Sequence, residues 1–165
     1  MSAAAVLQAL RERGLKLAIA ESLTGGALTS EFVAVPGASE VLLGGIVAYN
    51  TALKHELLGV SRGLLEQQGA VDPEVAAQMA GGVRAKLAAK CGIPEDLVVG
   101  LSTTGVAGPD SQDGKPVGTV FIGISISGSE SVLAELFDGD RAAIRQATVK
   151  ASVEGLLEQL AGNFQ

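Results

Sequence analysis

The hydrophobic residues of this chain occur in short runs that glycine, proline and polar residues separate. Residues 1–13 have the spacing of an amphipathic helix, and the apolar run at 15–20 predicts the first buried strand. Ser22 or Thr24 is then expected to cap a helix that continues to about residue 35, where a Pro-Gly pair stops it. The first part of the chain therefore predicts a helix, a strand and a second helix.

The middle of the chain continues this alternation of strands and helices. Residues 41–49 predict a central strand with a bend at its two glycines, and residues 51–58 predict a short helix that Gly59 ends. Asp72-Pro73-Glu74 predicts the start of a longer helix, which is expected to run to residue 90. This start combines a capping carboxylate, a proline in the first turn and an acid that the helix dipole favours.

The last part of the chain predicts a hairpin and a final helix. Residues 97–102 predict a third strand, and residues 117–127 and 131–137 predict the two strands of the hairpin. A glycine-rich polar loop at 104–118 is either functional, as its length suggests, or a plain connection between strands. The helix at 141–160 follows a capping aspartate. Together these elements predict an α/β sandwich around a mixed β-sheet.

Composition and charge narrow the class of protein. The 165 residues are 47% hydrophobic but only 3% aromatic, so we expect a core of small aliphatic side chains in a single domain, residues 1–165. The net charge of −6, with no run of more than two Lys or Arg residues, argues against direct binding of nucleic acid. No stretch is long and apolar enough to predict a membrane span.

Cysteine and histidine are too scarce for several kinds of site. The single cysteine, Cys91, cannot form an internal disulfide, which fits a reducing compartment. With one cysteine and one histidine, His55, a dedicated zinc site is not expected, and we predict no metal or cofactor. The sequence thus predicts a soluble cytoplasmic protein.

Ser22 and Lys54 are the candidate reactive pair. In a chain with one histidine, a lysine is the natural base to test for a serine nucleophile. Ser22 is either a helix cap or a nucleophile beside backbone N–H groups that would hold an oxyanion. Lys54 is either a solvated charge or, if residues 41–48 bury it, a neutral base. Tyr49 is a packing residue, a proton relay or a hydrogen-bonding partner of the nucleophile.

Two further features of the sequence are suited to binding an anion. The small residues from Thr103 to Pro109 resemble an anion-binding loop without matching the P-loop consensus, and they equally fit a glycine-rich connection. Arg141 and Arg145 are four residues apart on one helix. Because the helix dipole disfavours arginine near a helix start, an anionic partner would explain them better than an exposed surface.

Several motifs, taken in order, resemble the CinA carboxy-terminal domain family, the nicotinamide-nucleotide amidases also called PncC. The match is collinear over about residues 5–160, and no single motif carries it alone. The matching motifs are Ala20-Glu21-Ser22-Leu23-Thr24-Gly25-Gly26, Pro36-Gly37-Ala38-Ser39, Gly44-Gly45-Ile46-Val47-Ala48-Tyr49-Asn50, Lys54, Leu58-Gly59-Val60, Gly105-Val106-Ala107-Gly108-Pro109, Lys115-Pro116-Val117-Gly118-Thr119-Val120 and Gly139-Asp140-Arg141.

The resemblance implies a three-layer α/β/α sandwich and a serine–lysine amidohydrolase. Its substrate would be nicotinamide mononucleotide, whose carboxamide is hydrolysed to nicotinate mononucleotide and ammonia. The nucleophile and base would be Ser22 and Lys54, with Tyr49 beside them. Members often have cysteine where this chain has Leu23, so a cysteine nucleophile is excluded at that position. The residues expected to bind substrate or its oxyanion are Thr24, Gly25, Gly26, Thr104, Gly105, Ala107, Gly108, Arg141 and Arg145.

Two other functions remain open from the sequence. One is a nucleotide-binding module that has lost turnover, and the other is an interaction protein, since CinA-like proteins are named for competence and DNA-damage contexts. The complete set of Ser22, Tyr49 and Lys54 favours the enzyme. We also expect a homo-oligomer, because the chain is apolar overall and its core is poor in aromatic residues.

Overall fold

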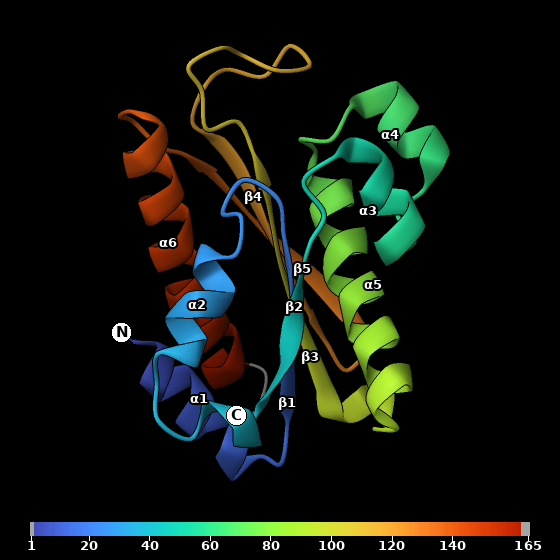
Figure 1. Cartoon of the computed structure of the whole chain (residues 1–165), viewed down its shortest axis with the longest axis vertical. Helices are drawn as coiled ribbons and strands as arrows, with labels where there is room; N and C mark the ends of the chain where they lie inside the picture. The colour runs from blue at the N-terminus through green and yellow to red at the C-terminus, as the bar shows by residue number, and fades with distance from the viewer. Residues whose placement is uncertain (1, 163–165) are drawn as a thin grey trace.

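The computed structural model describes residues 2–162 and contains a five-stranded mixed sheet (Figure 1). The strand order is β2-β1-β3-β4-β5; the first three strands run parallel, while β4 pairs antiparallel with both of its neighbours. The five strands are β1 (Lys16–Glu21), β2 (Leu42–Val47), β3 (Val98–Gly105), β4 (Thr119–Ile126) and β5 (Ser129–Leu136).

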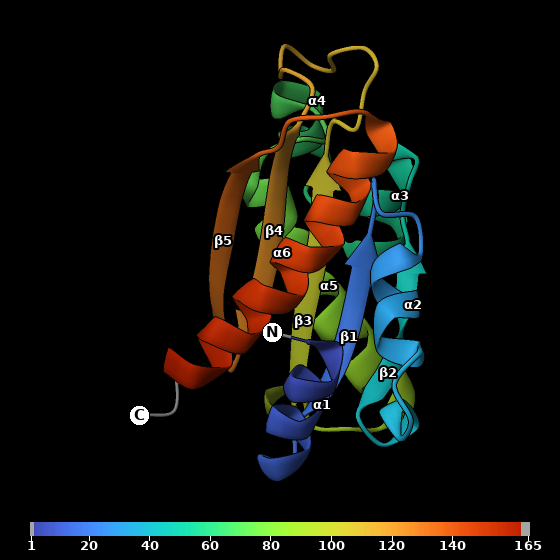
Figure 2. The same cartoon turned by 90° about the vertical axis from the view of Figure 1, so that its left-hand side faces the viewer.

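Helices cover both faces of this sheet, as Figures 1 and 2 show. One face carries α1 (Ala3–Glu12), α2 (Ala27–Val33) and α6 (Arg141–Gly162). The other carries α3 (Thr51–Leu58), α4 (Arg62–Gln68) and α5 (Pro73–Cys91). A separate hydrophobic core lies on each side of the sheet. The predicted three-layer α/β/α sandwich around a mixed sheet is confirmed.

The helices that carry clear start and stop signals form where the sequence predicts them. Asp72 Oδ1 accepts hydrogen bonds from the N–H groups of Glu74 and Val75, which caps α5. Asn50 caps α3 in the same way through Ala52 N–H, and Gly59 closes α3 in the left-handed conformation. Among the described helices, none is long and apolar enough to cross a membrane.

Three sequence predictions differ from the structure, and one helix was not predicted. The strand predicted as central, β2, lies at the edge of the sheet, next to β1 alone. Strand β3 continues to Gly105, so the glycine-rich loop begins at Val106 rather than at residue 104. Helix α4 was not predicted, although Ser61 Oγ accepts from Leu64 N–H as an ordinary cap. The cap of α2 is neither Ser22 nor Thr24, as described below.

Substitutions at two adjacent glycines of α5 can test how closely this helix packs against α3. A Cβ built on Gly82 would overlap the carbonyl oxygen of Leu58, at the end of α3, whereas one on Gly81 would lie 3.4 Å from the Glu130 side chain. We expect Gly81→Ala to raise the free energy of unfolding by up to about 1 kcal/mol through helix propensity. We expect Gly82→Ala to lower it by about 1–3 kcal/mol, because α3 must shift.

Urea unfolding of the two variants beside the unchanged protein measures this difference. The two substitutions add the same methyl group to neighbouring positions of the same helix, so each serves as the control for the other. Equal effects of the two substitutions would contradict a close contact between α5 and α3.

Candidate active site

A cavity of about 380 Å³ opens at the carboxyl ends of β1 and β3. Its walls come from five parts of the chain: the β1–α2 turn, the segment from Tyr49 to Lys54, the residues 70–71 before α5, the end of β3 with the β3–β4 loop, and Arg141 at the start of α6. The carboxyl ends of parallel strands are where open α/β sheets place their ligands. The volume also lies within the range of small-molecule sites, roughly 300–1,000 Å³.

Lys54 and Ser22 meet at the wall of this cavity. Lys54 Nζ donates to Ser22 Oγ at 2.9 Å and to the carbonyl oxygen of Ala48 at 2.8 Å. The lysine is only 1% exposed, and no carboxylate within residues 2–162 forms an ion pair with it. Burial without a counter-charge lowers the pKa of Lys54 from 10.5 to about 8. A substantial fraction of the amine is therefore neutral slightly above neutral pH.

A backbone hydrogen bond and two glycines form the tight turn that carries Ser22. Gly25 N–H donates to the carbonyl oxygen of Ser22 at 3.1 Å, and both Gly25 and Gly26 have positive φ angles, 58° and 99°. These φ values favour glycine, because a Cβ would be strained there. The chain can therefore leave β1 and reverse within a few residues.

Glu21 caps the helix after this turn, in place of the predicted Ser22 or Thr24. Its buried carboxyl group accepts from the N–H groups of Gly26, Leu28 and Thr29, and from the Thr29 hydroxyl, at 2.6–3.1 Å. The start of α2 is thus occupied by a side chain of the protein itself. The N–H groups of Gly25 and Gly26, which were predicted to hold an oxyanion, already have acceptors.

Two N–H groups in the turn remain without an acceptor. Those of Leu23 and Thr24 form no hydrogen bond with any other described residue. Leu23 lines the cavity, whereas the side chain of Thr24 is buried against the hydroxyl of Thr103 at 2.8 Å. Thr24, Gly25 and Gly26 do not line the cavity that contains Ser22.

Tyr49 and Arg141 meet at the exposed side of the cavity. The side chain of Tyr49 is 61% exposed, and its hydroxyl accepts a hydrogen bond from Arg141 Nη2 at 2.9 Å. Arg141 Nη1 also donates to the carbonyl oxygen of Gly108 at 2.6 Å. The structure therefore joins Tyr49 to Arg141, and it contains no direct hydrogen bond from Tyr49 to Ser22 or Lys54.

The end of β3 and the β3–β4 loop supply a further wall. Thr104, Gly105, Ala107 and Gly108, which the sequence assigns to substrate binding, all line the cavity. The Thr104 hydroxyl donates to the carbonyl oxygen of Ala70 at 2.6 Å, so it ties β3 to the segment before α5.

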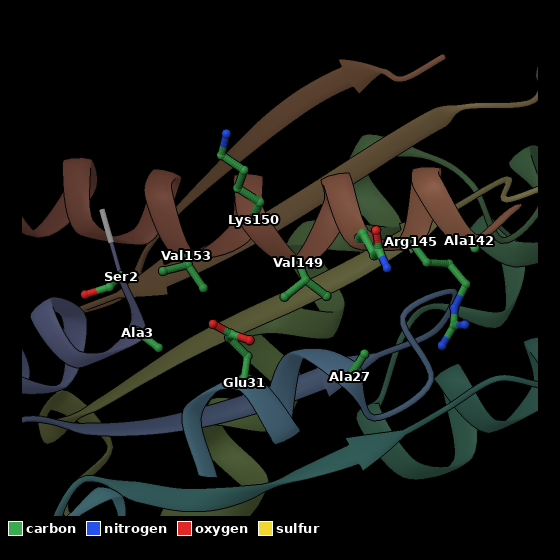
Figure 3. A pocket seen from close by; sticks show the side chains of 10 residues that line it. Ser2, Ala3, Ala27, Glu31, Ala142, Arg145, Val149, Lys150 and Val153 are labelled. Carbon is green, nitrogen blue, oxygen red and sulfur yellow. The ribbon is translucent and has the colours of Figure 1, made fainter. Parts of the chain in front are cut away.

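Arg145 lies apart from the cavity that contains Ser22, although it is only one helical turn after Arg141. Its Nε and Nη2 donate to the carbonyl oxygens of Leu23 and Thr24, each at 2.9 Å. It lines a different groove, of about 480 Å³, between α2 and α6 (Figure 3). The predicted contact between Arg145 and a substrate in the Ser22 cavity is therefore not supported by its position.

Sequence reasoning missed several polar residues of the site. Asn50, Asp110 and Gln112 line the cavity, and nothing in their local sequence distinguishes them from ordinary loop residues. Glu21 had a usable signal, since it is an acidic residue that directly follows the four apolar residues 17–20 of the strand. Within residues 2–162, no group of three or more His, Cys, Asp or Glu side chains is placed to hold a metal ion.

Comparisons with protein families and with solved structures agree with this architecture. The sequence model of the CinA C-terminal domain family matches residues 1–160 of this chain. A competence damage-inducible protein A from Klebsiella pneumoniae gives a TM-score of 0.88 at 29% identity, covering 99% of this chain and 96% of that chain. A CinA superfamily protein from Escherichia coli gives a TM-score of 0.82 at 31% identity, covering 93% and 88%.

Curated relatives are more similar in sequence but longer. A CinA-like protein from Frankia casuarinae is 44% identical over 157 residues. A relative from Geobacillus kaustophilus, whose name refers to competence damage, is 44% identical over 158 residues. Each alignment covers 95% of this chain but only 34% and 36%, respectively, of the relative.

Proposed function

The chain belongs to the family of CinA C-terminal domains, and from this premise we propose that it is an amidohydrolase acting on nicotinamide mononucleotide. The reaction adds water to the carboxamide and yields nicotinate mononucleotide and ammonia. One observation carries the proposal: a buried lysine with a lowered pKa donates to a serine hydroxyl at 2.9 Å beside a cavity of ligand size.

The first chemical step is the attack of Ser22 on the carboxamide. Neutral Lys54 accepts the hydroxyl proton through the existing 2.9 Å contact as Oγ forms a bond to the carbonyl carbon. The Ala48 carbonyl holds the ammonium form of Lys54 in the same place. The N–H group of Leu23, which lines the cavity and has no acceptor among the described residues, is the proposed donor for the oxyanion, since those of Gly25 and Gly26 are already bonded.

The second step releases ammonia. The tetrahedral intermediate collapses, its C–N bond breaks, and Lys54 returns a proton to the departing nitrogen. An ester between Ser22 and the nicotinoyl group remains. Water then attacks this ester and passes a proton to Lys54, which gives nicotinate mononucleotide and free Ser22. Every proton taken up by Lys54 is returned in the cycle.

The other cavity residues would bind the nucleotide. Arg141 is the arginine that lines the cavity, and its charge suits the phosphate. The polar side chains of Asn50, Asp110 and Gln112 line the same space and are suited to the ribose hydroxyls. Tyr49, which Arg141 holds at the exposed side of the cavity, would cover the bound ligand.

The rate should depend on pH through the protonation of Lys54. With a pKa of about 8, the neutral amine is a minor form at pH 6.5 and the major form at pH 9. We therefore expect kcat/KM to rise about tenfold per pH unit below pH 8 and to level off above it. Ammonia release measured from pH 6 to 9.5 tests this, and a rate independent of pH over that range would contradict the role of Lys54.

The proposed substrate is tested by incubating the protein with nicotinamide mononucleotide and measuring both ammonia and nicotinate mononucleotide. Free nicotinamide, which lacks the ribose and phosphate, is the control and should be turned over far more slowly. Saturable binding of nicotinamide mononucleotide by calorimetry without any product would instead identify a binding module that has lost turnover.

A further inference from the structure

The ammonium form of Lys54 is held by neutral groups alone. Its side chain is 1% exposed, and its Nζ donates to the hydroxyl of Ser22 and to the carbonyl oxygen of Ala48. Like charges repel more strongly where water is excluded than they do at the surface. A further positive charge brought close to Lys54 would therefore disfavour the ammonium form and favour the neutral amine.

Other titratable groups of the cavity do not neutralise Lys54. The charged side chains that share the cavity with it are Asp110, which is exposed, and Arg141, and Tyr49 is titratable as well. Arg141 donates to the Tyr49 hydroxyl and to the carbonyl oxygen of Gly108. None of these three side chains forms a hydrogen bond or an ion pair with Lys54.

The elements packed against α3 supply no counter-charge either. Their titratable side chains form no hydrogen bond or ion pair with Lys54 within residues 2–162. Glu21 of β1 is bonded to the start of α2, Glu56 pairs with Arg62 of α4, and Arg84 of α5 pairs with a residue after that helix. The others on α3, α4 and α5 are His55, Glu66, Glu74, Lys86, Lys90 and Cys91.

The substrate of the proposed reaction carries a positive charge close to its reacting group. The nicotinamide ring of the mononucleotide is a pyridinium, and the carboxamide is attached directly to it. Attack requires the carbonyl carbon to lie about 3–3.5 Å from Ser22 Oγ. Because Lys54 Nζ is 2.9 Å from the same oxygen, the ring nitrogen must come within about 10 Å of Nζ.

We propose that the positive ring of the substrate drives Lys54 into its neutral form on binding, so that the site selects carboxamides carried on a cationic pyridinium ring. This inference rests on the proposed function, because it concerns the substrate of the same site. The proton of Lys54 leaves to solvent as the ligand binds, and the neutral amine then accepts the proton of Ser22. A nucleotide with a neutral ring, such as a reduced dihydropyridine, would leave Lys54 protonated near neutral pH.

Steady-state kinetics give the size of the effect. The pKa of Lys54 is about 8 in the free protein, and a positive charge at this distance should lower that pKa by about one to two units. The pH profile of kcat/KM reports the free protein, whereas the profile of kcat reports the complex. For nicotinamide mononucleotide, we expect the midpoint of kcat to lie about one to two pH units below that of kcat/KM.

The benzamide analogue of the nucleotide is the matched control. A carbon atom replaces its ring nitrogen, so the ring is neutral, while the carboxamide, ribose and phosphate are unchanged. Its carboxamide is less reactive, which lowers the rate but does not move the midpoint. Because Lys54 is already 1% exposed, a neutral ring removes little further water from it. The midpoints of kcat and kcat/KM should therefore coincide for this analogue.

Calorimetry on Ser22→Ala tests the same coupling without turnover. Titrations from pH 6 to 8.5, in two buffers that differ in ionisation enthalpy, count the protons released on binding. At its maximum, nicotinamide mononucleotide should release about half a proton or more per molecule bound, and the benzamide analogue nearly none. Ser22→Ala/Lys54→Met should release the same small amount with both ligands, which would assign the proton to Lys54.

The outcomes separate this inference from the proposed function. Equal proton release by the two ligands in Ser22→Ala overturns the inference, while the amidase proposal stands. Greater release by nicotinamide mononucleotide, in a protein whose unchanged form makes no ammonia from it, supports the inference and overturns the proposed reaction. Absence of any binding of nicotinamide mononucleotide to the unchanged protein overturns both.

Discussion

Replacement of Ser22 by alanine is expected to lower kcat for ammonia release by at least about 10³-fold, because it removes the proposed nucleophile. The cavity loses one hydroxyl and keeps its shape, so binding of nicotinamide mononucleotide should change little. Both quantities can be measured on one preparation, by ammonia release and by calorimetry. A selective loss of kcat is the signature of a group that acts in the transition state.

Ser30→Ala is the matched control for this experiment. Ser30 is an exposed serine on α2, the helix that follows the Ser22 turn. Its side chain makes no hydrogen bond with another described residue. It should have the activity of the unchanged protein. If Ser22→Ala retained more than about a tenth of the original kcat, the serine mechanism proposed here would be wrong.

Lys54→Met should abolish activity to a similar extent and also change how stability depends on pH. The pKa of Lys54 is about 8 in the folded protein and 10.5 as its ordinary value. Between these values the unfolded chain binds more protons than the folded one, so the free energy of unfolding rises as the pH rises. From pH 7 to 9.5 this single group should add about 2 kcal/mol, and Lys54→Met should lack that increase.

Urea unfolding at pH 7 and at pH 9.5 measures the effect. The quantity to compare between variants is the change in the free energy of unfolding between these two pH values. Other groups also titrate in this window, so the unchanged protein and Lys90→Met, an exposed lysine near the end of α5, serve as references. Both should show the rise. A Lys54→Met protein with the same rise would show that Lys54 is not the group responsible.

The burial of Lys54 has a cost at neutral pH that the surrounding fold must offset. A protonated lysine without a carboxylate partner is unfavourable in the interior. Here the hydroxyl of Ser22 and the carbonyl of Ala48 supply two acceptors, while α5 keeps α3 in place through the close contact at Gly82. A stabilising replacement of Lys54 that removes activity would fit the usual conflict between stability and function at active sites.

Elements with local start and stop signals could be predicted from the sequence. The helix that carries Lys54 and the longer helix after Asp72 were predicted with nearly correct ends, because their caps are neighbours in the chain. Helix α4 has such a signal at Ser61, and it was overlooked. Strand β2 was predicted but misplaced, since its apolar sequence does not reveal that only β1 pairs with it.

The details of the site depend on contacts between distant parts of the chain, and these could not be predicted. Pairing of Ser22 with Lys54 could be proposed from residue types, but the burial that lowers the pKa of Lys54 is a property of the folded protein. Glu21 caps α2 from the preceding strand, which no local capping pattern describes. Arg145 was assigned to the substrate, whereas its guanidinium is bonded to the turn. The catalytic roles themselves remain predictions.

The capping of α2 by Glu21 bears on how a nucleotide would be oriented under the proposed function. Helix starts commonly attract phosphate groups, but this one already holds a carboxyl group and would repel a second anion. Under the proposed function the phosphate would therefore lie near Arg141, which lines the cavity, and the carboxamide would lie near Ser22 and Lys54. If the proposed function holds, the carboxyl group that completes the helix also removes that helix start as a phosphate site, which leaves Arg141 as the cation for the phosphate.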